Sequence, residues 1–275
     1  MKPEFRTEIP ADWKGIRIVG VPDLLKQESS SLSPAVREAL NAQNFTGAPN
    51  SFLPLILQEQ DRVDNLLLAG LGDVASPTPL QSRRFGALLA DAVRDRSAVL
   101  FRTEDVFPGA LPDERTLMHV LSGFCARQYS FDRYRSDGEK TIAQRLVVVD
   151  ARADRLAQLW ERQGHIVDAA LRVKDLVSEP PNVLYPESMA DMAAQLKNCG
   201  LDVTVFDEKA LAELGMGALL GVGQGSARPP RLVVLRWTGD RNPDNPPVVV
   251  AGKGITFDAG GLSLKTRPHM RGMKN

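Results

Sequence analysis

Apolar residues along the chain follow two spacings, which predict alternating strands and helices. Short runs rich in leucine or β-branched residues predict buried strands at Ile16–Val21, Asn65–Gly70, Ala98–Phe101 and Arg145–Val149. Between them, apolar residues at helical spacing predict helices from Pro79 to about Arg94 and over Glu114–Tyr129. Strands separated by helices of this length are typical of parallel βαβ units. The first half of the chain is therefore expected to form an α/β domain.

The second half continues the alternation. A long helix is predicted from Asp154 to about Val177, either unbroken or divided at Gly164, and Pro180 and Pro181 end it because proline cannot continue the hydrogen-bond ladder. Helices are then expected from Pro186 to near Gly200 and over Glu208–Leu214, and strands at Leu201–Phe206, Arg231–Trp237 and Pro247–Ala251. Polar composition predicts a surface loop over Tyr129–Thr141 and a turn over Gly239–Asn245.

Composition and charge exclude several classes of protein. Hydrophobic residues make up 43% and charged residues 25%, which are values of globular domains. The 34 basic residues balance the 34 acidic ones, so no global field attracts nucleic acid or an anionic membrane. No apolar run approaches the roughly 18 residues that cross a membrane, and MKPEFRTEIP lacks the apolar run of a signal peptide. Cys125 and Cys199 form no metal or disulfide pattern, so we expect a cytoplasmic protein.

Candidate chemistry is concentrated near the C-terminal end of the sequence. The predicted strand Pro247–Ala251 runs directly into Gly252-Lys253-Gly254, and ligands of α/β sheets bind at the carboxyl ends of strands. Asp258 then lies between Lys253 and Lys265 in a glycine-rich stretch. Each lysine is able to lower the pKa of Asp258, and this carboxylate is able to hold a hard cation. The alternative is a surface ion pair on a glycine-rich turn.

The string GKGITFDAGGLSLK (Gly252–Lys265) closely resembles the signature of the leucyl (cytosol) aminopeptidases, a two-metal peptidase family of M17-type architecture. Further segments resemble the same family in the same order: FDRYRSD (Phe131–Asp137), DLVSEPPNVLYPE (Asp175–Glu187) and GMGALLGVGQGSARPPRLVVLRW (Gly215–Trp237). The resemblance implies a macro-like α/β domain over residues 1–162. It implies the first part of an α/β aminopeptidase catalytic domain over residues 163–275.

The resemblance also implies roles for three residues. Lys253 takes the position of a metal ligand that binds through its neutral amine, and Asp258 takes the position of a carboxylate that bridges both metals. Lys265 takes the position of the lysine that polarises the scissile carbonyl and stabilises the oxyanion. The implied cofactors are two divalent ions, for which Mn²⁺, Zn²⁺ and Mg²⁺ remain open because the ligands are borderline. The implied activity is release of N-terminal amino acids, leucine among them, from peptides by a homohexamer.

The sequence departs from the family where Met273-Lys274-Asn275 ends it, one residue before an expected metal-binding aspartate. The family's later carboxylates and a bicarbonate-binding arginine are likewise not in the sequence. One aspartate cannot hold two divalent ions, so we expect an incomplete and inactive fragment that does not bind the metals stably. The catalytic part should expose apolar faces. The alternative is a non-catalytic binding or assembly module that acts through the N-terminal α/β domain.

Other patterns are assigned structural roles. The glycines of Gly221–Gly225 resemble part of a dinucleotide fingerprint but precede a Pro-Pro pair rather than opening a helix, so we expect a tight structural loop. His119 is expected to be a surface or packing residue. His269 lies close to the Asp258 segment in sequence, and the family does not use this position as a ligand. No basic excess supports binding of DNA.

Overall fold

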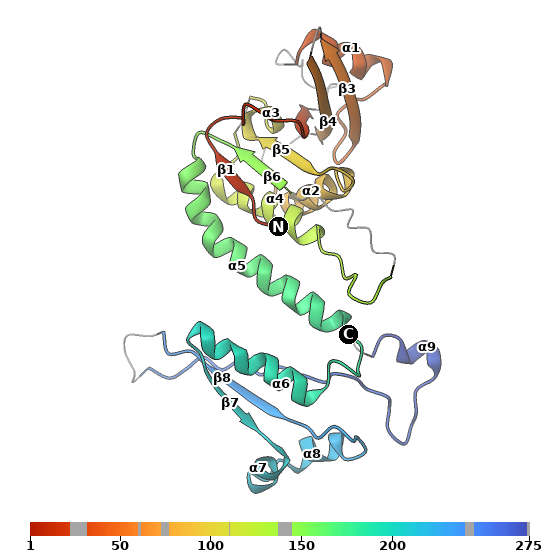
Figure 1. Cartoon of the computed structure of the whole chain (residues 1–275), viewed down its shortest axis with the longest axis vertical. Helices are drawn as coiled ribbons and strands as arrows, with labels where there is room; N and C mark the ends of the chain where they lie inside the picture. Colours follow the sequence, from red (N-terminus) through yellow and green to blue (C-terminus); the bar gives the residue numbers. More distant parts are fainter. Residues whose placement is uncertain are drawn as a thin grey trace. The chain divides into compact units, whose positions relative to one another are not determined.

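The computed structural model describes residues 1–22, 32–59, 62–72, 77–109, 111–136, 145–239 and 245–273. These residues form two compact units, unit 1 over Met1–Arg172 and unit 2 over Val173–Asn275 (Figure 1). A single helix, α5 (Ala153–Ser178), runs through the boundary between them. None of the helices in the described ranges is long and apolar enough to cross a membrane.

Unit 1 is built on a six-stranded sheet with the strand order β1-β6-β5-β2-β4-β3. The strands are β1 (Glu4–Arg6), β2 (Ile16–Pro22), β3 (Phe52–Glu59), β4 (Arg62–Gly72), β5 (Ala98–Arg102) and β6 (Arg145–Val149). All neighbours are parallel except β3, which is antiparallel to β4. The predicted parallel α/β domain is therefore confirmed.

Two strands of this sheet were not predicted. β1 has only three residues, which is too short to show a pattern. β3 contains Pro54, which has no amide hydrogen and weakens the sequence signal for a strand. Proline is tolerated there because β3 lies at the edge of the sheet.

Helices cover both faces of the sheet in unit 1. They are α1 (Pro34–Ala42), α2 (Pro79–Ala92), α3 (Thr103–Val106), α4 (Glu114–Arg127) and α5. Three begin at side-chain caps: Ser33, Thr78 and Asp113 each accept a hydrogen bond from a first-turn amide. Thr78 and Gln81 form a reciprocal capping box at the start of α2. The start of α2 is thus fixed by its own sequence.

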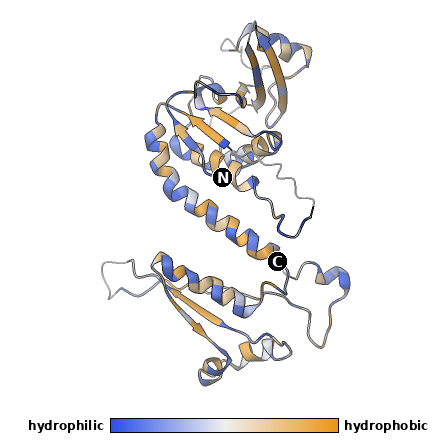
Figure 2. Cartoon of the chain, in the orientation of Figure 1, coloured by the Kyte–Doolittle hydropathy of each residue, from blue (hydrophilic) through white to orange (hydrophobic). Residues whose placement is uncertain are grey.

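The two faces of the sheet have separate apolar cores. On one face, residues of α2, α4 and α5 pack against alternate residues of the strands, with Phe101, Phe124 and Trp160 among the largest buried side chains. On the other face, Val36 and Leu40 of α1 pack over β2, β3 and β4. Figure 2 shows the central strands as almost continuously hydrophobic, whereas α5 alternates along its length. Strands buried on both faces have this composition.

Helices α2 and α4 approach each other at two glycines. A Cβ atom on Gly86 would lie 1.9 Å from the carbonyl oxygen of Val120, and one on Gly123 would lie 2.0 Å from that of Arg83. No side chain larger than hydrogen fits at either contact, since both neighbours are backbone atoms. Glycine at these two positions therefore sets the distance between α2 and α4.

Unit 2 has a two-stranded antiparallel sheet of β7 (Asp202–Phe206) and β8 (Leu232–Arg236). Its helices are α6 (Pro186–Ala194), a 3₁₀ helix over Gln195–Cys199, α7 (Glu208–Glu213), α8 (Gly217–Gly223) and α9 (Arg267–Met270). The helices expected after Pro186 and over Glu208–Leu214, and the strands expected at Leu201–Phe206 and Arg231–Trp237, are confirmed within a few residues.

The strand predicted at Pro247–Ala251 is wrong. These residues have no regular secondary structure, and Val248, Val249 and Val250 are 94%, 81% and 90% exposed. A strand exists only when its backbone groups pair with a neighbour, and among the described residues of unit 2 the two strands β7 and β8 pair with each other. High β propensity alone did not make these residues a strand.

Three smaller expectations are also decided. The long helix is unbroken, so Gly164 does not divide it. Gly221 and Gly223 lie in α8, so the expected loop is wrong for them; the glycines close a helix instead of opening one. The predicted loop from Tyr129 is irregular as far as residue 136, and residues 137–141 and 240–244 of the two predicted polar segments lie outside the described ranges.

Replacing Gly86 or Gly123 with alanine is expected to destabilise unit 1, although alanine is the better helix former. The new methyl group meets a backbone carbonyl and has to push α2 and α4 apart, which costs about 1–3 kcal/mol or more. Urea denaturation followed by circular dichroism measures the change. Leu80→Ala on α2 is the control, because Leu80 is 76% exposed and its loss should change stability by no more than about 0.5 kcal/mol. Alanine variants of Gly86 as stable as the parent chain would contradict the close contact.

Candidate functional site

The segment over residues 252–265 forms an irregular loop that closes on itself. Gly260 and Gly261 have φ angles of 92° and 61°, a region that side chains other than glycine rarely adopt. The Lys265 amide donates a hydrogen bond of 3.0 Å to the carbonyl of Ala259, which closes the turn. A Cβ on Gly260 would also lie 2.3 Å from the carbonyl oxygen of Ser263. The two glycines therefore bring Lys265 back towards Asp258.

Asp258 and Lys265 form the central contact of this loop. Lys265 Nζ lies 2.6 Å from Asp258 Oδ2, and the Gly260 amide donates to Asp258 Oδ1 at 2.8 Å. The carboxylate is 48% exposed and the lysine side chain 26% exposed. The ion pair is thus partly open to water, and its contribution to stability is correspondingly small.

The Met273 sulfur is a contact that the sequence pattern did not predict. Lys265 Nζ lies 2.9 Å from Met273 Sδ, a weak acceptor for an ammonium donor. A thioether carries no charge, and nothing in the local pattern indicates that it faces a lysine. Met273 comes to Lys265 only because the chain after α9 turns back to the loop.

Charge around Asp258 holds the pKa of its carboxyl below the ordinary value. The ion-pair hydrogen bond from Lys265 is the largest cause, followed by the backbone hydrogen bond from Gly260, and the charge of Lys253 contributes less. Both lysines therefore act on Asp258 in the expected direction. The carboxylate stays ionised at neutral pH.

Lys253 and Asp258 line the same cavity within unit 2. The cavity has a volume of about 520 Å³, and its walls are mainly apolar. Leu176, Leu184 and Met189 line it together with Met273. Lys253 is exposed and has no ion-pair or hydrogen-bond partner among the described residues. The structure thus places all three predicted residues around one loop, with Asp258 as their common neighbour.

The donors of this loop do not by themselves fit a site for two divalent ions. Among the described residues, Asp258 is the one carboxylate that lines the cavity, and no group of three His, Cys, Asp or Glu side chains is able to hold a metal. Two divalent ions need several carboxylate or imidazole ligands. In the described chain, Asp258 forms an ion pair with Lys265 on a glycine-rich turn.

The histidines do not join this loop. His269 Nδ1 lies 2.8 Å from Thr266 Oγ1 at the start of α9. His119 is on α4 of unit 1, where both ring nitrogens are buried without a hydrogen-bond partner in the described chain. Burial lowers the pKa of His119, with the charges of Arg83 and Arg115 acting in the same direction. A packing role for His119 agrees with this environment.

Comparison with protein families finds matches over both units. The N-terminal domain of the cytosol aminopeptidase family matches residues 19–138, and the catalytic domain of the same family matches residues 172–275. A probable cytosol aminopeptidase of Nitrobacter hamburgensis is 38% identical over 246 residues, which cover 87% of this chain and 48% of that protein. One from Rhodopseudomonas palustris is 37% identical over 255 residues, covering 90% and 50%. The chain spans about half the length of these curated relatives.

Solved structures agree with these matches. The bottromycin maturation enzyme BotP, in complex with Mn, superposes with a TM-score of 0.72 at 26% identity, over 94% of this chain and 52% of that one. A mutant of tomato leucine aminopeptidase superposes with a TM-score of 0.68 over 86% of this chain and 50% of that one. The two sequences are 18% identical, so this superposition shows a shared fold alone.

Replacing Lys265 with methionine is expected to raise the pKa of Asp258 towards its ordinary value. The substitution removes the largest cause of the lowered pKa, so the carboxyl takes up its proton at a higher pH. Lys253→Met is the matched control and should raise the pKa less, because Lys253 acts through charge at longer range. A ¹³C NMR titration of the Asp258 carboxyl measures both. An equal or larger rise in Lys253→Met would contradict the observed pairing.

The 275-residue chain is expected to bind no Mn²⁺ tightly. A single carboxylate that already pairs with a lysine is too few ligands for a stable site. Equilibrium dialysis against micromolar Mn²⁺ measures the bound metal. Asp258→Asn is the comparison variant and should bind as little as the parent chain. Two ions retained per chain would overturn this reading of the ligand set.

Proposed function

The chain belongs to the cytosol aminopeptidase (M17) family, and from this premise we propose that its native gene product is a metal-dependent aminopeptidase that releases N-terminal amino acids, leucine among them, from peptides. The juxtaposition of Lys253, Asp258 and Lys265 on one loop of the catalytic-domain match is the observation that carries the proposal. The Mn-bound state of BotP supports the use of divalent metal.

Lys265 is proposed as the electrophilic catalytic residue. Its ammonium group is already held by the glycine turn, by Asp258 and by Met273. A fixed cation facing the oxygen of a scissile carbonyl stabilises the negative charge that develops there in the transition state. Because Lys265 is anchored before substrate arrives, little rearrangement is needed during reaction.

Lys253 and Asp258 are proposed as two ligands of a metal site to which other carboxylates contribute. Asp258 supplies a carboxylate of lowered pKa, which remains ionised and available as a ligand. Lys253 projects into the same cavity without a partner in the described chain. An amine binds metal only after it loses its proton, and adjacent cations favour that loss. The other ligands are not among the described residues of this loop.

The apolar surface of unit 2 supports a role for further polypeptide in the native protein. The side chains of Val248, Val249 and Val250 are almost fully exposed, and Trp237 is 75% exposed. Contiguous exposed apolar residues mark surfaces that another chain segment or partner covers. We propose that the native protein covers this surface and is a homohexamer in the cytoplasm, as the family resemblance implies.

Loss of the Lys265 charge is expected to remove most of the activity of the native gene product. Removing one oxyanion-stabilising donor lowers kcat about 10²–10³-fold, so Lys265→Ala should fall in this range. Hydrolysis of leucine p-nitroanilide with added Mn²⁺ is the assay. Lys209→Ala is the control, since Lys209 is an exposed lysine on α7 of the same unit and should leave the rate unchanged.

Two outcomes of this assay would overturn the proposal. A native product with no metal-dependent hydrolysis of aminoacyl substrates would remove the proposed activity. Full activity of Lys265→Ala would leave the activity in place but remove Lys265 from the mechanism. The 275-residue chain, assayed beside the native product, is expected to hydrolyse the substrate no faster than the buffer.

A further inference from the structure

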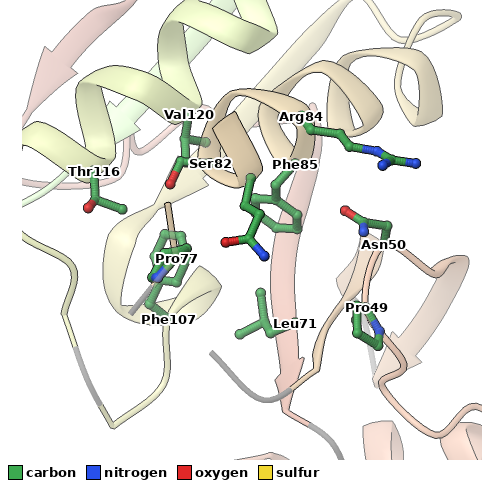
Figure 3. Close-up of a pocket in the computed structure, with 12 residues that line it drawn as sticks. Pro49, Asn50, Leu71, Pro77, Ser82, Arg84, Phe85, Phe107, Thr116 and Val120 are labelled. Atoms are coloured by element: carbon green, nitrogen blue, oxygen red, sulfur yellow. The ribbon is translucent and has the colours of Figure 1, made fainter. Parts of the chain in front are cut away.

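Unit 1 contains a cavity far along the sequence from the Asp258 loop. Its volume is about 340 Å³, at the lower end of the range of roughly 300–1,000 Å³ that is usual for small-molecule sites. It lies at the carboxyl end of β4, where Gly70 and Leu71 line it, beside the start of α2 (Figure 3). The carboxyl ends of strands in α/β sheets are the usual place for ligands.

One wall of the cavity is held rigidly by backbone hydrogen bonds. The Asn50 amide donates to the carbonyl of Gly70 at 3.0 Å, and the Gly70 amide donates to the carbonyl of Ser51 at 2.8 Å. A Cβ on Gly70 would lie 2.1 Å from the carbonyl oxygen of Ala48, so the strand end and this loop are in direct backbone contact. Asn50 itself has a φ of 60°. The wall is therefore preformed, which favours binding because little ordering is needed.

The middle of the cavity is aromatic and apolar. Phe85 and Phe107 face each other with ring centroids 6.3 Å apart and planes tilted by 55°. Figure 3 shows Phe85 and Leu71 at the centre, with Phe107 and Pro77 to one side. Tilted aromatic rings next to aliphatic side chains are a suitable surface for a planar ring of a ligand.

The other side of the cavity is cationic. Arg84 and Asn50 lie there in Figure 3, and Arg84 forms no ion pair with any other described residue. The described residues that line the cavity include no aspartate or glutamate. Asp113, the cap of α4, accepts its hydrogen bond from Thr116 at 2.7 Å and is not a lining residue. A ligand with a positive group would meet the Arg84 charge without compensation, whereas an anion would gain from it.

We propose that this cavity binds a small organic anion that carries a planar ring, with the ring against Phe85 and Phe107 and the anionic group on Arg84. None of the described lining residues offers a carboxylate to the ammonium group of a free amino acid, which favours ligands without such a group. A carboxylate and a phosphate both satisfy the guanidinium of Arg84. The site is independent of the proposed peptidase activity, and its test uses neither metal nor peptide.

The experiment is an NMR titration of the ¹⁵N-labelled 275-residue chain with four probes. Adenosine monophosphate and indole-3-acetate each combine a ring with an anion, whereas adenosine has only a ring and inorganic phosphate only an anion. We expect at least one of the first two to shift the amide signals of Asn50, Gly70 and Leu71 saturably. Adenosine and inorganic phosphate should each bind at least about tenfold more weakly than the probe that binds best. Binding of adenosine monophosphate alone would point to a purine ring with a phosphate, and binding of indole-3-acetate alone to an indole-like ring with a carboxylate.

Arg84→Ala is the variant that tests the cationic side. It should weaken binding of the successful probe about tenfold or more, and Arg84→Lys should recover part of that loss. Arg83→Ala is the matched control, an exposed arginine on the same helix that does not line the cavity, and it should leave binding unchanged. Both positions are exposed, so the variants should fold, which circular dichroism verifies. The proposal is overturned if no probe shifts these amides, if adenosine binds as tightly as its monophosphate, or if Arg84→Ala binds like the parent chain.

Discussion

Parallel strands with apolar side chains on both faces need a helical layer on each side, and this requirement organises unit 1. α2, α4 and α5 bury one face of the sheet, and α1 buries the β2, β3 and β4 part of the other. The layer of α2 and α4 is possible at its observed spacing only because Gly86 and Gly123 let the two backbones meet. At the carboxyl end of β4, the loop residues Pro49 and Asn50 and the first turns of α2 enclose the cavity beside Gly70.

Unit 2 shows what happens when the same requirement is not met. Its sheet has two strands, which contact α6, and such a pair would be marginally stable in water without the helix. Val248–Val250 have the composition of a buried strand but remain exposed and unpaired within the described residues. The loop that follows them is nevertheless ordered locally, because the positive φ angles of Gly260 and Gly261 and the contact of Asp258 with Lys265 close it.

The Asp258–Lys265 pair is compatible with both interpretations of this loop, a surface ion pair and part of a catalytic site. As a partly exposed ion pair it contributes little to stability. In the proposed enzyme, the same arrangement fixes an ammonium group and keeps the neighbouring carboxylate ionised, and both properties are useful to an electrostatic catalyst. The surface pair and the catalytic pair are thus one geometry, and the catalytic role requires further metal ligands besides the residues of this loop.

The sequence by itself determined the elements whose signals are local. The buried runs at β2, β4, β5 and β6, the start of α2 at Pro79 and the end of α5 before Pro180 were predictable because spacing and proline geometry act within a few residues. The string around Asp258 likewise predicted the effect of both lysines on the carboxylate pKa, while the catalytic and metal-binding roles of Lys253, Asp258 and Lys265 stay predictions. Strand β3 and the Met273–Lys265 contact were decided by tertiary structure, since a sheet edge tolerates Pro54 and only the folded chain brings the sulfur to the amine. The wrong strand at Pro247–Ala251 has the same origin: a strand depends on a hydrogen-bonding neighbour, and no local pattern of residues contains that neighbour.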